Sequence, residues 1–198
     1  YTDNKGVAIG YGYNPTQNDS QYNKNILDYA GVDEATQKKI LANSSKFKNT
    51  ELGKVPEAFK DIKFTKEQID KMALYSKRSY ENDFVSVLQE KLDNKHYSVA
   101  KKAIVMKEYQ NLPDNQKAVL THMTYKVGRG GLERYNTFFD NFISYLDNPT
   151  LENKKKVANG FIYRYRKNGK MLSDTRVSDM HAELFMHDIP KKEAIAKK

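Results

Sequence analysis

The feature of this sequence that most constrains its fold is the segment from Phe64 to Leu92, FTKEQIDKMALYSKRSYENDFVSVLQEKL. Thr65 and Gln68 have the spacing of a helix capping box, and Phe64 and Ile69 occupy the two positions of a hydrophobic staple. Because Ser76 interrupts the apolar row that follows, the segment predicts either one long helix or two abutting helices. The residues that recur on one helical face are Ile69, Met72, Ala73, Tyr80, Phe84, Val87 and Leu88.

Glycine and proline divide the rest of the chain into shorter elements. VAIGYGYN at residues 7–14 alternates small and apolar residues and predicts strand, turn and strand, with Gly6 in the preceding turn. A polar loop is expected over residues 15–25. The remaining predicted helices span residues 33–47, 98–111, 114–127, 132–146, 150–166 and 173–185.

These elements predict an α+β fold in a single domain over residues 1–198. We expect a small N-terminal lobe with a β-hairpin at residues 1–64 and a connecting helix at 65–93. A larger, all-helical C-terminal lobe is expected at 94–198.

The composition excludes several kinds of site. The 198 residues include no cysteine, which rules out disulfides, a cysteine nucleophile and cysteine-bound zinc. The four histidines form no HExxH pattern, so we predict no metal site, and no organic cofactor is implied. No run of residues approaches the roughly 20 apolar positions that a membrane span needs.

The formal net charge of +9 indicates an anionic partner. A nucleic acid, a membrane surface and an acidic polymer such as the bacterial cell wall all meet that requirement. The lysines are spread along the chain, and the sequence lacks the zinc-finger, ribonucleoprotein and GxxG motifs of nucleic-acid modules. Charge alone leaves a nucleic-acid partner open.

The opening residues place a carboxylate, Asp3, beside a glycine-rich stretch. DNKG at residues 3–6 suits a type I turn, in which Asp3 is only a turn residue. Alternatively, the hairpin forms the wall of a cleft and Asp3 faces a substrate. The residues themselves favour the turn interpretation.

Two segments taken together resemble the phage-type lysozymes, a family of muramidases that includes toxin domains of bacteriocins and secreted antibacterial effectors. The family's hairpin, Y-x-D-x-x-G followed by T-I-G-Y/I-G, is similar to Tyr1, Asp3, Gly6 and the IGYG of Ile9–Gly12. Its L-x-x-N-Q … A-L-x-x-x-x-F-N/Q-x-G helix is similar to residues of the 112–128 segment. The matching positions there are Leu112, Asn115, Gln116, Ala118, Tyr125 and Gly128.

Further segments extend the resemblance across nearly the whole chain. FTKEQIDKMA resembles the start of the helix that joins the two lobes of the family. TRVSDMHAELF resembles the closing helix, in which Arg176 matches an arginine that packs behind the active site. The sequence departs from the family where Ala8 replaces a threonine and where Lys126 replaces an asparagine or glutamine.

The resemblance implies a peptidoglycan hydrolase that cleaves the β-1,4 bond between N-acetylmuramic acid and N-acetylglucosamine. Such a reaction needs a proton donor and an ionised carboxylate. The resemblance gives the second role to Asp3, which would position water for inverting attack in a cleft between the lobes. Arg176 is expected to support this site by pairing with a carboxylate. The expected substrate contacts are Gly12, Tyr13, Asn14, Tyr125, Lys126 and Gly130.

The same resemblance places the proton donor, a glutamate, upstream of Tyr1. No glutamate within the chain is an evident substitute. Glu34 and Glu67 lie in the first turns of predicted helices, where a negative charge favours the helix dipole. Glu133 follows the glycine-rich loop and is the remaining glutamate that the sequence offers near the expected cleft.

The expected setting is the periplasm or the bacterial cell wall, as part of a phage lysin, a tail protein or an antibacterial toxin. The partners implied are peptidoglycan glycan strands and, for a toxin, an immunity or inhibitor protein. The chain is expected to act as a monomer, without nucleic acid. Two alternatives stay open: a non-catalytic peptidoglycan-binding module, and a basic nucleic-acid-binding domain.

Overall fold

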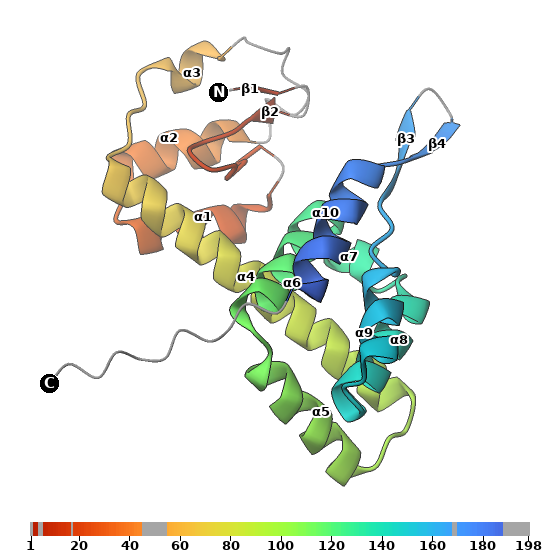
Figure 1. Cartoon of the computed structure of the whole chain (residues 1–198). Helices are drawn as coiled ribbons and strands as arrows, with labels where there is room; N and C mark the ends of the chain where they lie inside the picture. The colour runs from red at the N-terminus through yellow and green to blue at the C-terminus, as the bar shows by residue number, and fades with distance from the viewer. Residues whose placement is uncertain (1, 4–5, 17, 45–54, 168–169, 188–198) are drawn as a thin grey trace, which may run out of the picture. The chain divides into compact units, whose positions relative to one another are not determined.

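The computed structural model describes residues 2–3, 6–16, 18–44, 55–167 and 170–187 (Figure 1). The chain divides into two compact units, Tyr1–Ser79 and Tyr80–Lys198. Helices make up most of the described residues in both units.

The protein is helical in class, and the expectation of an α+β fold is wrong. Strands β1 (Thr2–Asp3) and β2 (Gly6–Val7) have only 2 residues each. Strands β3 (Arg164–Lys167) and β4 (Lys170–Ser173) have 4 residues each and pair antiparallel. Neither two-stranded ladder is large enough to offer a sheet face on which a core can form.

The strands expected over residues 7–14 fail to extend because the chain turns back on itself there. Gly10 and Gly12 both have positive φ, and a single bridge joins Ile9 to Tyr13. Gly10 also lies against the long helix: a Cβ added to it would stand 2.4 Å from Cγ2 of Ile69. A side chain at Gly10 is therefore excluded by both its backbone conformation and its surroundings.

The first unit contains α1 (Ser20–Ala30), α2 (Glu34–Ser44), α3 (Glu57–Lys60) and the first part of α4 (Lys66–Asn94). The loop expected at 15–25 is wrong from Ser20 onward. Asp19 caps α1 by accepting a hydrogen bond of 2.7 Å from the Tyr22 N–H. The core of this unit consists of Val7, Tyr13, Ile26, Leu27, Ala30, Val32, Ile40, Phe59 and Met72.

Helix α4 is continuous through 29 residues, which decides between the two alternatives for the 64–92 segment. The capping box forms as predicted: the Thr65 N–H donates to Oε1 of Gln68 at 3.0 Å, and the Gln68 N–H donates to Oγ1 of Thr65 at 3.1 Å. Ser76 interrupts the apolar row without breaking the helix. Its hydroxyl instead accepts a hydrogen bond from the Tyr22 hydroxyl at 3.2 Å.

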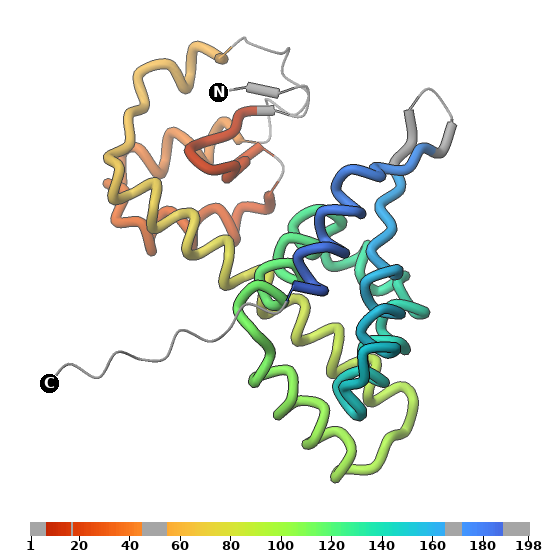
Figure 2. The backbone as a smooth tube through the Cα atoms, viewed as in Figure 1, coloured from red at the N-terminus to blue at the C-terminus, as the bar shows by residue number. Residues whose placement is uncertain are grey.

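The second unit follows the end of α4 with α5 (Val99–Asn111), α6 (Asp114–Val127), α7 (Arg129–Leu132) and α8 (Asn136–Asp147). It ends with α9 (Leu151–Ala158), the β3–β4 ladder and α10 (Thr175–Met186). Helix α8 packs against α5 and α9, and α10 packs against α6 and α9 (Figure 2).

Helix α9 stops at Ala158, so the helix expected over 150–166 is too long. The chain leaves the helix at Gly160, which lies so close to α8 that an added Cβ would stand 3.0 Å from Cδ2 of Phe138. Arg164–Lys167 then forms β3 instead of a last helical turn. The sequence signal was the Asn168-Gly169 pair, which is typical of hairpin connections.

Aromatic side chains dominate the core of the second unit. The ring of Phe84, from α4, lies 5.4 Å from that of Phe139 and 5.6 Å from that of Phe142, both on α8. Phe161 continues the cluster, with centroids 5.2 Å from Phe138 and 5.5 Å from Phe185 of α10. These contacts fix the positions of α4, α8 and α10 within the unit.

Polar side chains from two other helices hold the carboxyl end of α10. Asn115 donates to the carbonyls of Leu184 and His187 at 2.7 and 2.8 Å. Gln116 and the buried Lys154 donate to the carbonyls of Phe185 and Met186 at 3.2 and 3.1 Å. The last carbonyls of a helix lack partners within the helix, so these bonds replace water there.

The helices that the structure describes include none that is long and apolar enough to cross a membrane.

Replacing Phe139 by alanine should lower the free energy of unfolding by about 3–5 kcal/mol, because the ring is fully buried and its removal leaves a cavity. Chemical denaturation followed by circular dichroism measures the change. Leu151→Ala, at a residue that is 62% exposed, is the matched control and should have a small effect. Equal losses in the two variants would contradict the packing described for α8.

Candidate functional site

Asp3, the expected catalytic carboxylate, lies at the end of β1. Its backbone pairs with Gly6 in the antiparallel β1–β2 ladder, as Thr2 pairs with Val7. The structure therefore places the backbone of Asp3 in a ladder of two residue pairs, which is not the β-hairpin lobe that the sequence predicted. The side chain of Asp3 lies outside the described part of the structure.

The turn after this hairpin is held by its own backbone. The Ile9 N–H donates to the Tyr13 carbonyl at 2.7 Å, and the N–H groups of Gly12 and Tyr13 donate to the Ile9 carbonyl at 3.2 and 3.1 Å. The backbone N–H groups of Gly12 and Tyr13, two of the expected substrate contacts, are thus engaged within the turn.

Tyr13 and Asn14 serve the core of the first unit. Tyr13 is buried, and its hydroxyl donates to Oδ1 of Asn23 at 2.9 Å; burial raises the pKa of this hydroxyl. The amide oxygen of Asn14 accepts from the N–H and the hydroxyl of Thr16 at 3.0 and 2.6 Å. The side chains of these two expected contacts are therefore committed to internal hydrogen bonds.

In the second unit, three expected substrate contacts lie together at the end of α6. Tyr125 and Lys126 are exposed in its last turn, and Gly128 ends the helix with φ of 67°. Gly130 follows in α7 and is exposed, with open space around the position of a Cβ. This exposed helix end can receive a ligand.

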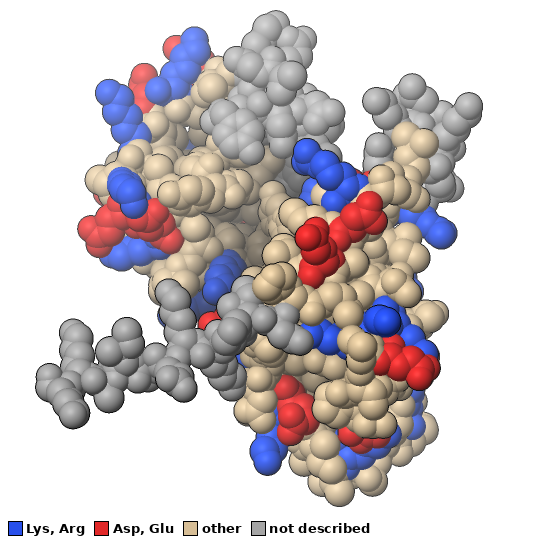
Figure 3. Space-filling model, viewed as in Figure 1, with Lys and Arg blue, Asp and Glu red and all other residues tan. Residues whose placement is uncertain are grey.

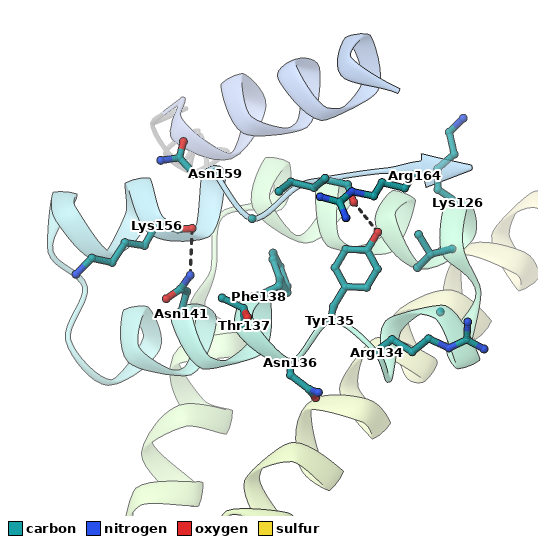
Figure 4. A pocket seen from close by; sticks show the side chains of 14 residues that line it. Lys126, Arg134, Tyr135, Asn136, Thr137, Phe138, Asn141, Lys156, Asn159 and Arg164 are labelled. Carbon is teal, nitrogen blue, oxygen red and sulfur yellow. Dashed lines mark hydrogen bonds between the residues drawn. The ribbon is translucent and has the colours of Figure 1, made fainter. Parts of the chain in front are cut away.

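A cavity of about 1040 Å³ begins beside this helix end. Lys126, Val127 and Gly131 form one side of it, and the start of α8 and the segment after α9 form the rest (Figure 4). Its lining residues are Lys126, Val127, Gly131, Arg134, Tyr135, Asn136, Thr137, Phe138, Asn141, Lys156, Asn159, Gly160, Ile162 and Arg164.

The lining of this pocket has a distinctive chemistry. It includes four cations, three asparagines, a threonine and a tyrosine, and it includes no carboxylate. Tyr135 donates its hydroxyl to the Ile162 carbonyl at 2.7 Å, and Arg164 lies beside that hydroxyl (Figure 4). Burial raises the pKa of the Tyr135 hydroxyl, and Arg164 opposes this effect.

Carboxylates gather instead around Arg129 in α7. Its guanidinium pairs with Glu90, lies 3.5 Å from Glu133 and 4.0 Å from Asp83. Burial raises the pKa of Asp83, and Arg129 opposes the shift. Glu133, the remaining glutamate that the sequence offered, is thus part of an ion-pair network.

Arg176 lies in the first turn of α10 and is exposed. Among the described residues, none forms a salt bridge with it. Its expected pairing with a carboxylate thus finds no partner in the part of the chain that is described. No group of three or more histidine, aspartate or glutamate side chains suited to a metal ion occurs within the same residues.

The sequence reasoning missed most of the pocket. Lys126 is the one lining residue among the expected substrate contacts. The lining residues that were not expected include Arg134, Tyr135, Asn136, Asn141 and Arg164. ERYN at residues 133–136, directly after the glycine-rich loop, was the available signal. The pocket forms only when α6, α8 and the segment after α9 pack together.

Charged side chains are otherwise mixed on the surface. On the face shown in Figure 3, lysine and arginine side chains alternate with aspartate and glutamate side chains. Many of the described lysines pair with a carboxylate, as Lys24 does with Asp28 and Lys66 with Asp70. The excess of positive charge therefore does not collect there into one continuous stripe.

No family model matches the chain, and neither a curated protein nor a solved structure matches it.

Reversing the charge of Lys126 tests whether the pocket attracts an anionic wall polymer. Lys126→Glu should weaken binding to purified sacculi by roughly fivefold at low salt and by less at high salt, because ions screen surface charges. A sedimentation binding assay at several ionic strengths measures this. Lys155→Glu, at an exposed lysine outside the lining, is the matched control. Equal weakening by the two variants would mean that the pocket has no special part in binding.

Proposed function

We propose that this protein is a peptidoglycan hydrolase that cleaves the β-1,4 bond between N-acetylmuramic acid and N-acetylglucosamine. The observation that carries the proposal is the pocket at the end of α6. It includes Lys126, which the resemblance to phage-type lysozymes had placed at the substrate, and it lies beside Tyr125 and Gly130.

The chemistry of the lining suits an anionic glycan. Asparagine and threonine side chains both donate and accept hydrogen bonds, as sugar hydroxyl and acetamido groups require. Tyr135 and Ile162 offer apolar surface for a sugar ring, and Arg134 and Arg164 offer donors to carboxylates. A cavity of about 1040 Å³ is at the upper end of the size range of small-molecule sites.

In this proposal the ionised carboxylate is Asp3, which activates a water molecule for inverting attack. Its place in the β1–β2 hairpin agrees with the hairpin position of the family carboxylate.

A non-catalytic peptidoglycan-binding module is the second candidate. Among the described residues, no carboxylate lines the pocket, and this favours the binding module, because a carboxyl group is the usual proton donor in glycoside cleavage. The two functions share the ligand and the basic pocket. They differ in whether the protein hydrolyses the glycan and whether this hydrolysis depends on Asp3.

Asp3→Asn is the test that separates them. The variant keeps the shape of the side chain but removes its charge, so wall hydrolysis should fall by roughly 10²–10⁴-fold. The assay is the loss of turbidity of purified sacculi. Sacculus binding should persist in the variant.

The matched control is Asp61→Asn, because Asp61 is an exposed carboxylate that lies 3.4 Å from the Lys39 ammonium group, far in sequence from Asp3. It should hydrolyse sacculi like the unmodified protein. Hydrolysis that survives Asp3→Asn would remove Asp3 from the mechanism. Binding of sacculi without hydrolysis by the unmodified protein would establish the binding module instead.

A further inference from the structure

A chain of three buried or half-buried polar side chains runs through the second unit, and the proposed function leaves it without a role. The Tyr163 hydroxyl lies 2.6 Å from Nδ1 of His181, and Nε2 of His181 lies 2.7 Å from Nδ1 of His122. His181 is 1% exposed and Tyr163 is 5% exposed. We call these three residues the imidazole relay.

Hydrogen counting shows how the relay responds to a proton. A neutral imidazole has one donor and one acceptor nitrogen, so all bonds of the relay can be made in either direction. A proton on His122 turns its Nδ1 into a donor and sets one direction throughout. A second proton, on His181, brings two N–H groups face to face and breaks the His122–His181 bond.

The outer end of the relay supports an exposed aromatic residue. The His122 ring stacks on Tyr125 with centroids 5.9 Å apart and planes 14° apart, and Tyr80 meets the Tyr125 ring edge-on at 5.5 Å. Tyr125 remains 47% exposed. Its orientation thus depends on His122, whose own ring plane is fixed by the bond to His181.

The surroundings of the two imidazoles disfavour their protonation. Burial lowers the pKa of His181 to about 4, with His122 and Lys126 adding to the effect. Burial, followed by Lys126, also lowers the pKa of His122. Tyr163, whose pKa is raised by burial and by Tyr135, stays neutral.

The groups facing the relay offer no compensating charge. Lys126 of α6 is its charged neighbour, and the ring of Phe161 packs edge-on against His181 at 5.7 Å. No carboxylate in the described ranges pairs with either imidazole. Protons are therefore taken up more readily by the unfolded chain, and stability is lost as the pH falls from about 6.5 towards the lowered values.

We propose that the imidazole relay is a proton-responsive support that holds the Tyr125 ring for ligand contact, so that acidification releases the ring and weakens binding at the end of α6. The identity of the ligand, peptidoglycan, rests on the proposed function. The coupling between the histidines and Tyr125 does not rest on it.

The first test needs no ligand. In the full chain labelled with ¹³C in its histidine and tyrosine rings, nuclear magnetic resonance follows His122, His181 and Tyr125 through an acid titration. Both histidines should be neutral at pH 7, and the Tyr125 signals should shift with the midpoint of the histidines. Tyr125 signals that stay constant while the histidines titrate would overturn the proposal.

Tyr163→Phe tests whether the support extends to the buried end of the relay. The variant removes only the hydroxyl, so the tautomer of His181 should change and the Tyr125 signals should move at pH 7. His187→Gln is the matched control, because His187 is exposed and lies outside the relay. Tyr125 signals that are unchanged in Tyr163→Phe would limit the support to His122 and refute the relay.

The second test measures binding to purified sacculi at pH 7.5 and at pH 3.5, below the lowered pKa of His181, at one ionic strength. Binding should weaken about tenfold at the lower pH, as expected for loss of an ordered aromatic contact. His122→Phe keeps a stacking ring but has no proton to gain, so it should lose most of this pH dependence. His187→Gln, measured in parallel, reports any change in the sacculi themselves.

The outcomes separate the two proposals. An equal fall in His122→Phe would refute the part assigned to His122. If sacculi fail to bind at every pH while the histidines and Tyr125 titrate together, the proposed function fails and the relay stands.

Discussion

The packing of Phe84 between Phe139 and Phe142 is the interaction on which the second unit depends. It joins the end of α4 to α8, two helices that are distant in sequence, and the cluster continues through Phe138 and Phe161 to α10. The pocket opens at the start of α8, and His181 lies on α10 against Phe161. The aromatic core thus sets the positions of the polar groups that pack against it and line the pocket.

The polar residues of the second unit fall into two groups with different duties. Asn115 and Gln116, at the start of α6, donate hydrogen bonds to carbonyl groups at the end of α10. Tyr125, Lys126 and Gly130, from the end of the same helix, remain exposed. The residues at the start of α6 therefore stabilise the fold, whereas residues at its end are exposed. A sequence motif that spans α6 includes residues with both roles.

Structural features that depend on neighbouring residues could be predicted from the sequence, whereas features that depend on tertiary contacts could not. The capping box of α4 and the bounds of α6 were predicted because they depend on residues within a few positions of each other. Helix α1 was missed because Asp19 caps a segment whose buried face includes the polar Asn23. The α+β class was inferred from period-two alternation, but positive φ at Gly10 and Gly12 closes a turn there. Of the pocket, only Lys126 was predicted, because its other residues meet only through tertiary packing.

The hydrogen bonds to the carboxyl end of α10 fix the position of that helix along its own axis. Side chains from α6 and α9 bind the carbonyls of four consecutive residues, Leu184 to His187, so the register of the helix is set at its end. One residue added between His181 and Phe185 would rotate the earlier part of the helix by about 100° and carry His181 away from Tyr163. Changes of length within α10 are therefore poorly tolerated, because they would separate the relay residues from one another.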